Sequence, residues 1–147
     1  MYSWIAGLVV RRTVRQINDG NVRALMRNYS DDSTVVFPGD HSWGGTFRGR
    51  DEIERFFRRV VEARLKFAAG EVVAKGPPWR LTVCCQLFDR AAAPDGTVVY
   101  SNRVMELIET AWGKIQYQEL YLDTQKVAEF DRYLAAQPGV QTDRPPV

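Results

Sequence analysis

Apolar residues recur at helical spacing in three parts of the chain, and this pattern predicts most of its helices. Ile5, Leu8 and Val9 begin the first amphipathic segment. A second short apolar stripe follows the break at residues 19–21, and a third follows the Asp51/Glu54 capping pattern. We therefore expect helices at residues 4–18, 22–29 and 51–61, and a last helix capped by Asp123 that runs to about residue 135.

The remaining segments are rich in β-branched and aromatic residues and are separated by turn residues, which is typical of strands. A first strand is expected at Ser33–Phe37, followed by a glycine-rich loop at Pro38–Gly49. Four longer strands are expected at about residues 67–74, 79–89, 97–108 and 114–122. This order predicts an α+β fold: three N-terminal helices packed in a curved, mostly antiparallel sheet, with a C-terminal helix. We expect one domain at residues 1–136 and a polar tail at residues 137–147.

The composition of the chain argues against several classes of function and does not point to a particular one. The net charge of +2 gives no reason to expect nucleic acid or a membrane as a partner. The chain has one histidine, and its cysteines, Cys84 and Cys85, are neighbours, so no metal-ligand spacing occurs and we expect neither a metal nor another cofactor. The apolar start lacks the order of a signal peptide, so a cytoplasmic location is predicted.

Three motifs, in order and spacing, resemble those of SnoaL-like and ketosteroid isomerase-like proteins of the NTF2-like superfamily. They are Tyr29-Ser-Asp-Asp-Ser-Thr-Val-Val-Phe-Pro-Gly, then Gly49-Arg-Asp-Glu-Ile-Glu-Arg-Phe-Phe, and finally Gly113-Lys-Ile with Tyr121-Leu-Asp123. The resemblance runs from about Trp4 to Leu134 and implies a cone-shaped fold with a pocket at its mouth. The superfamily contains isomerases, cyclases, hydrolases and binding proteins, so the resemblance does not by itself select a reaction.

The catalytic groups of ketosteroid isomerases do not carry over to this sequence. The resemblance places the carboxylate base at Phe37, the tyrosine donor near Thr13 and the protonated aspartate near Met105. None of these side chains can perform the role.

The groups of two further chemistries are missing as well. The catalytic Asp of SnoaL-type cyclases corresponds to Leu120, and the Arg and second Asp of limonene epoxide hydrolase correspond to Cys84 and Gln86. The resemblance and strand alternation together predict an apolar pocket. Its predicted lining is Thr13, Ile17, Val35, Phe37, Trp43, Phe56, Val60, Cys84, Gln86, Met105, Gln118, Leu120 and Leu122.

Several interpretations of the function remain open. The first is a pocket protein that binds a small apolar, ring-containing metabolite of polyketide or steroid type. The second is an isomerase, cyclase or lyase whose acid–base site is rebuilt from Asp40, His41 and an inward-pointing Arg103. The alternative for these residues is structural and is favoured here: Asp40 and Ser42 bond to the loop backbone, while His41 and Trp43 close one end of the core. The third is a protein–protein adaptor.

In the adaptor hypothesis, a partner protein binds to the convex face of the sheet. The same face is expected to form a homodimer, with Glu106, Glu119 and Tyr121 pointing outward from it.

Overall fold

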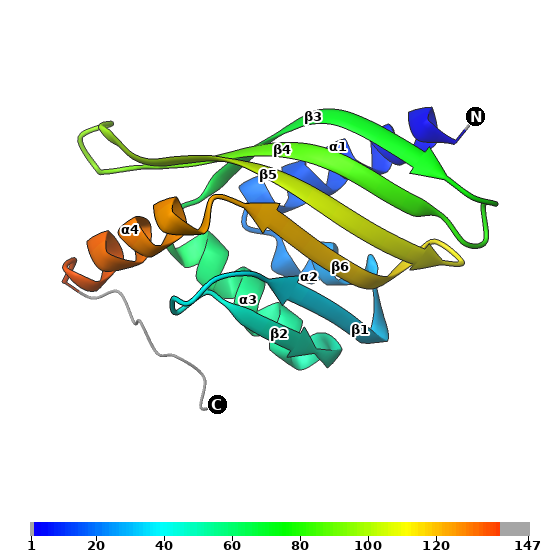
Figure 1. Ribbon diagram of the computed structural model, residues 1–147, viewed down its shortest axis with the longest axis horizontal. Coiled ribbons are helices and arrows are strands. Elements are labelled where there is room, and N and C mark those ends of the chain that lie inside the picture. Colours follow the sequence, from blue (N-terminus) through cyan, green and yellow to red (C-terminus); the bar gives the residue numbers. More distant parts are fainter. Residues whose placement is uncertain (1, 139–147) are drawn as a thin grey trace.

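The computed structural model describes residues 2–138 and shows the predicted α+β fold (Figure 1). The helices are α1 (Ser3–Asn18), α2 (Val22–Met26), α3 (Gly49–Glu62) and α4 (Thr124–Ala135). The strands are β1 (Tyr29–Phe37), β2 (Gly45–Arg48), β3 (Lys66–Lys75), β4 (Thr82–Ala92), β5 (Val98–Ala111) and β6 (Lys114–Leu122).

The strands form one curved sheet in the order β2-β1-β6-β5-β4-β3. All neighbours are antiparallel except β1 and β6, which run parallel. In Figure 1, α1, α2 and α3 lie on one face of this sheet and α4 lies at one end of it. Helices α1, α2 and α3 thus cover the concave face, and no helix within residues 2–138 lies over the convex face.

The structure departs from the predicted boundaries by up to three residues at the ends of β4 and β5, and more substantially in two places. The segment 38–49, predicted to be a loop, contains the short strand β2, which pairs with the end of β1. The first strand begins at Tyr29 and not at Ser33, so Tyr29 belongs to the sheet and not to the second helix. The predicted domain boundary at residue 136 stays a prediction, and residues 139–147 of the predicted tail lie outside the described residues.

A side-chain cap explains where α4 begins, whereas α3 begins differently from the prediction. Asp123 accepts hydrogen bonds from the backbone N–H groups of Gln125 and Lys126, as expected of an N-cap residue. At the start of α3 the predicted pattern of Asp51 and Glu54 does not form the cap. The backbone N–H of Arg48 instead donates to the Glu52 carboxylate at 2.7 Å.

Two clusters of buried apolar side chains hold the layers together. The larger one joins α3 and α4 to the sheet and includes Ile53, Phe56 and Phe130. The smaller one lies under α1 and joins Ala6 to inward-facing residues of β4 and β5, among them Val83. Between these clusters, under α1, the packing leaves room for a cavity.

Candidate functional site

A cavity of about 330 Å³ lies between α1 and the concave face of the sheet. Most of its wall is apolar and comes from one side of α1 and the inward residues of β4, β5 and β6. The polar side chains in its lining are Thr13, Asn28, Tyr29, Cys85, Glu106, Thr110, Gln118 and, near the mouth, Tyr2. Among the described lining residues, Glu106 is the only Asp, Glu, Lys or Arg.

Glu106 belongs to a buried polar cluster that spans four strands. The Tyr29 hydroxyl donates to the side-chain oxygen of Gln118 at 2.5 Å. The Cys85 thiol donates to the Glu106 carboxylate at 3.6 Å between sulfur and oxygen. Cys85 and Glu106 are directly paired across β4 and β5, and Gln118 lies on the neighbouring strand β6. We call Tyr29, Cys85, Glu106 and Gln118 the buried polar cluster.

Burial changes the protonation of this cluster. It raises the pKa of Glu106 to about 7, from an ordinary value of 4.5, while hydrogen bonds from Gln118 and Cys85 act in the opposite direction. Burial, and then the nearby Glu106 charge, raises the pKa of both Tyr29 and Cys85. Near neutral pH, therefore, Tyr29 and Cys85 keep their protons, whereas Glu106 is divided between its acid and carboxylate forms.

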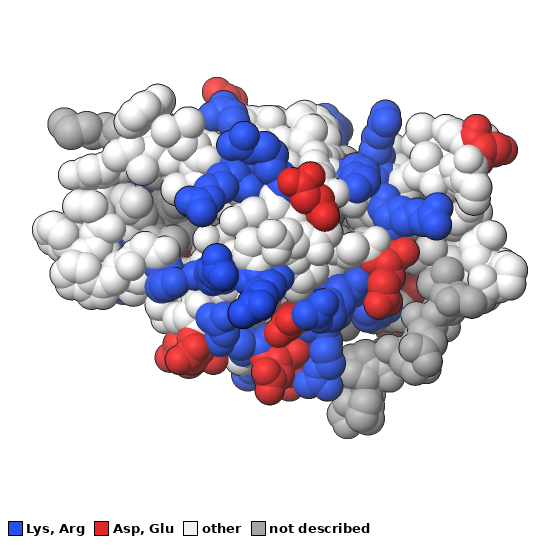
Figure 2. All heavy atoms as spheres, turned by 180° about the vertical axis from the view of Figure 1, so that it is seen from behind, with Lys and Arg blue, Asp and Glu red and all other residues white. Residues whose placement is uncertain are grey.

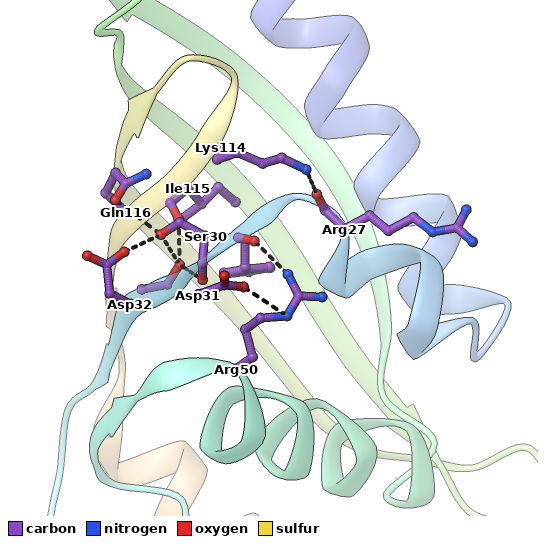
Figure 3. A network of polar contacts seen from close by, with 10 residues as sticks. Arg27, Ser30, Asp31, Asp32, Arg50, Lys114, Ile115 and Gln116 are labelled. Atoms are coloured by element: carbon purple, nitrogen blue, oxygen red, sulfur yellow. Dashed lines mark hydrogen bonds and ion pairs between the residues drawn. The ribbon is translucent and has the colours of Figure 1, made fainter.

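A second polar network fixes the start of β1, and with it the position of Tyr29 (Figure 3). The pairing of β1 with β6 is irregular between Tyr29 and Thr34. Over this irregularity, the Ser33 hydroxyl donates to the Ile115 carbonyl at 2.6 Å. The Arg50 guanidinium donates to the Tyr29 carbonyl at 2.9 Å and lies 3.8 Å from the Asp31 carboxylate. Helix α3 and strand β6 thus hold the Tyr29 backbone from both sides.

A smaller cavity of about 60 Å³ lies next to the first and shares Glu106 and Gln118 with it. The Tyr100 hydroxyl donates there to the Asp89 carboxylate at 3.1 Å, and the Asn102 amide donates to the Tyr100 oxygen at 3.1 Å. Burial raises the pKa of Asp89 to about 6. Two buried carboxyl groups therefore face the interior from β4 and β5.

Some predicted lining residues do face the interior. Thr13, Ile17 and Gln118 line the larger cavity. Those that line the smaller one are Phe37, Trp43, Phe56, Val60, Gln118, Leu120 and Leu122. Val35 is fully buried in the core and lines neither cavity.

The predicted orientation was wrong for Cys84, Gln86, Arg103 and Met105. In β4 the buried positions are Val83, Cys85 and Leu87, so Cys84 and Gln86 lie on the other face. In β5 the buried positions include Val104 and Glu106, and Arg103 and Met105 are exposed. Because side chains alternate along a strand, an error of one residue in the predicted register exchanges the inward-facing and the outward-facing side chains. This exchange also explains why Glu106 was predicted to point outward.

The acid–base group predicted from Asp40, His41 and Arg103 is not brought together. His41 is buried beside Phe37, edge to face with 5.7 Å between ring centroids, and burial lowers its pKa. Asp40 is exposed, and neither residue lines either cavity. Arg103 lies on the convex face. The loop residue Ser42 instead ties this segment to α4, since its N–H and hydroxyl both donate to Asp131, at 2.9 and 2.5 Å.

Of the buried polar cluster, only Gln118 was predicted to line the pocket, whereas Tyr29, Cys85 and Glu106 were missed. One signal was available: the alternation of Tyr100, Asn102, Val104, Glu106 and Ile108 places Glu106 on the same face as the apolar residues. Among the residues that the structure describes, no group of three or more His, Cys, Asp or Glu side chains is placed to hold a metal ion.

Comparison with known proteins identifies relatives of this fold. Residues 10–118 match the family model described as SnoaL-like domain. Bal32a, from a soil-derived mobile gene cassette, has a TM-score of 0.74 and 20% identity, over 90% of this chain and 100% of Bal32a. SalBIII, an epoxide hydrolase/cyclase-like enzyme in pyran ring formation of the polyether salinomycin, has a TM-score of 0.69 and 18% identity, over 86% and 97% of the two chains.

TerC, co-crystallized with polyporic acid, is also similar in structure. Its TM-score is 0.67 at 20% identity, and the match covers 87% of this chain and 97% of TerC. Among curated proteins nothing matches. At these identities the structural likeness establishes the fold and not the chemistry.

Proposed function

The chain belongs to the SnoaL-like domain family, and from this premise we propose that it binds an apolar, ring-containing metabolite of polyketide or steroid type in the cavity under α1. The observation that carries the proposal is Glu106, the only carboxyl group among the described lining residues of this mostly apolar cavity. A wall of this kind takes up an apolar ring system, and one polar group fixes its orientation.

The state of Glu106 indicates which substituent the ligand carries. With a pKa of about 7, Glu106 is largely protonated below neutral pH and can donate a hydrogen bond. A ring carbonyl or hydroxyl oxygen that reaches Glu106 accepts this bond, whereas an anionic ligand gains nothing from an uncharged cavity and meets the carboxylate at higher pH. The proposed ligand is therefore neutral and oxygenated. SalBIII takes part in pyran ring formation of a polyether and TerC was co-crystallized with polyporic acid, so both similar proteins are associated with oxygenated ring compounds.

Titration calorimetry with ring ketones tests the proposal. We would use androst-4-ene-3,17-dione and an uncharged anthraquinone, each at pH 6 and pH 8. Binding is expected to weaken at the higher pH as Glu106 loses its proton. Glu106→Leu should bind less tightly at pH 6 because the donor is gone. Glu109→Leu is the matched control, since Glu109 lies on the same strand but is exposed on the convex face. Equal binding by the Glu106 and Glu109 variants would rule out the proposed role of Glu106.

A second candidate is an enzyme that moves a proton on the bound ring. The raised pKa of Glu106 favours it, because an acid–base group works best when its pKa is close to the working pH. In its carboxylate form Glu106 can accept a proton from a carbon beside a ring carbonyl, and return it at another position. NMR detection of deuterium exchange into the bound ketone, present in the wild type and absent in Glu106→Gln, distinguishes this enzyme from a binding protein.

The convex face of the sheet supports a separate proposal about assembly. Val73, Phe88, Met105 and Tyr121 are exposed there, and we propose that two copies pair through this face. Sedimentation velocity with Met105→Glu tests it: the variant is expected to be a monomer and the wild type a dimer. A wild type that is monomeric at every concentration would favour the adaptor hypothesis, in which a different protein covers the face.

A further inference from the structure

The end of the molecule at which α1 begins carries a group of exposed apolar side chains. Trp4 is 72% exposed and Trp112 is 82% exposed. We call the group the rim patch; its members are Trp4, Ile5, Leu8 and Val9 on α1, Trp79 in the β3–β4 connection and Trp112 in the β5–β6 turn. Three of the four tryptophans in the chain are therefore exposed at this end.

The helical period explains why so many apolar residues of α1 point outward. At 100° per residue, Trp4 and Leu8 lie on the side of the helix opposite to the buried Ala6 and Ile17. Arg12 lies on the same outward side of the helix, about 6 Å further along the helix axis than Leu8. The exposed side of α1 is therefore apolar in its first half and basic in its second.

The rim patch lies at the mouth of the larger cavity. Ile5 and Val9 are exposed and also line the cavity, so they stand where the cavity meets the surface. Tyr2, Pro78 and Gly113 line it from the same end. In the β5–β6 turn, Trp112 has a positive φ of 50° and is followed by Gly113 at 77°, so this two-residue turn displays a tryptophan where a small residue is usual. Trp112 and Trp79 are joined by a backbone hydrogen bond of 3.0 Å.

Positive charge is concentrated beside the rim patch. The first 30 residues contain five arginines and one acidic residue, Asp19, although the net charge of the whole chain is only +2. Arg11, Arg12 and Arg15 are exposed on α1, and none forms an ion pair with another described residue. Figure 2 shows the uncharged end of the molecule, on the left of that view, with basic side chains next to it. Such a surface complements a negatively charged partner with an apolar interior.

We propose that the rim patch docks on an anionic lipid bilayer, with Trp4 and Leu8 entering the interfacial region and the arginines of α1 contacting lipid headgroups. A helix with Trp and Leu beside Arg is suited to lie in this interface. Tryptophan rings prefer the level of the headgroups, and basic residues are attracted to anionic lipids. None of the helices among the described residues has the length and apolar character needed to cross a bilayer. The docking is therefore peripheral.

This orientation brings the cavity mouth to the lipid surface. An apolar molecule dissolved in the bilayer can then enter the cavity between α1 and the β5–β6 turn without crossing water. The net charge did not indicate a membrane, because it averages over the whole chain and hides the difference between α1 and the rest. The docking proposal does not depend on the ligand proposed above. It rests on the rim patch and the arginines of α1, and vesicle binding can be measured without any ligand in the cavity.

Vesicle flotation with the full chain tests the docking. The protein is mixed with vesicles of phosphatidylcholine and phosphatidylglycerol in equal parts, or of phosphatidylcholine alone, at low and high sodium chloride. Binding is expected to the anionic vesicles and to weaken with salt. Arg11→Gln with Arg12→Gln should weaken binding about thirtyfold, at about fivefold per arginine. The matched control is Arg90→Gln with Arg103→Gln, two exposed arginines of the convex face, which should bind like the wild type.

A second pair of variants tests the apolar part. Trp4→Ser with Leu8→Ser should weaken binding at least about tenfold. Val98→Ser, exposed at the start of β5, should not change it. Because tryptophans are placed in the interface, the wild-type fluorescence should also shift to shorter wavelength with anionic vesicles, a readout that needs no variant.

Three results would overturn the proposal. The first is no binding of the wild type to anionic vesicles. The second is equal loss in the α1 variants and their control variants. The third is a change of oligomeric state in the lipid-free Trp4→Ser, Leu8→Ser variant by sedimentation velocity, which would make the rim patch a contact between protein chains.

Discussion

Replacing Glu106 by Gln keeps the size of the side chain but removes its ability to ionise, so the stability of the protein should lose part of its dependence on pH. In the native protein the pKa of Glu106 is raised to about 7, whereas the unfolded chain has the ordinary value of 4.5. A carboxyl group with a raised native pKa binds its proton more tightly in the folded state. Its contribution to stability is therefore complete below pH 4.5 and is lost as the pH rises through 7.

The size of the effect follows from the two pKa values. At about 1.4 kcal/mol for each pH unit between them, ionisation of Glu106 costs the native state about 3 kcal/mol once the pH is above 7. A wild-type domain of this size has a free energy of unfolding of about 5–15 kcal/mol, so a loss of 3 kcal/mol is readily measured. Glu106→Gln should thus match the wild type within about 1 kcal/mol at pH 4.5, and exceed it by about 3 kcal/mol at pH 8.

Urea unfolding followed by circular dichroism at pH 4.5, 5.5, 6.5 and 8 measures this difference. The other buried groups are present in both proteins, so most of their pH dependence cancels. The charge of Asp89 adds a smaller part, since it also raises the pKa of Glu106. The pKa values of Tyr29 and Cys85 are raised by burial, which keeps both groups protonated across this range. Glu109→Gln, on the convex face of the same strand, should show no pH-dependent difference from the wild type.

A stability difference between wild type and Glu106→Gln that is the same at every pH would refute the reasoning. It would mean that Glu106 ionises as readily in the folded protein as in the unfolded chain. The buried polar cluster would then be open to water, and the proposed hydrogen bond from protonated Glu106 to a ring oxygen would lose its basis.

Three further predictions concern single side chains. Tyr29→Phe should reduce the free energy of unfolding by about 1–3 kcal/mol in urea, because the buried Gln118 oxygen loses its donor; Tyr121→Phe, which is exposed, should change it little. Leu25→Ala, in the core, should cost about 2–5 kcal/mol in the same assay, against less than about 0.5 kcal/mol for the exposed Leu8→Ala, and equal losses would contradict the packing described. His41, the only histidine, should titrate below its ordinary pKa of 6.5 by NMR, so stability should fall as the pH drops below 6.5; a normal or raised value would show that the charge of Asp131 outweighs the burial of the ring.

The order of helices and strands could be predicted from local patterns alone. Helical spacing of apolar residues and caps such as Asp123 act within a few residues, so they are readable without the fold. The short strand β2 was missed because Gly45–Arg48 forms a strand only by pairing with β1, which is a contact between segments. The motifs that resemble SnoaL-like proteins were sufficient to identify the family.

The site could be predicted only in part, because it depends on which face of each strand turns inward. Gln118 and Leu120 were placed correctly, but a one-residue difference in β4 and β5 put Met105 in the cavity in place of Glu106. Local sequence sets the alternation along a strand, and the packing of α1 and α3 against the sheet chooses the face. The same packing raises the pKa of Glu106 and places the exposed side of α1 at the cavity mouth, since burial and charge are properties of the folded molecule.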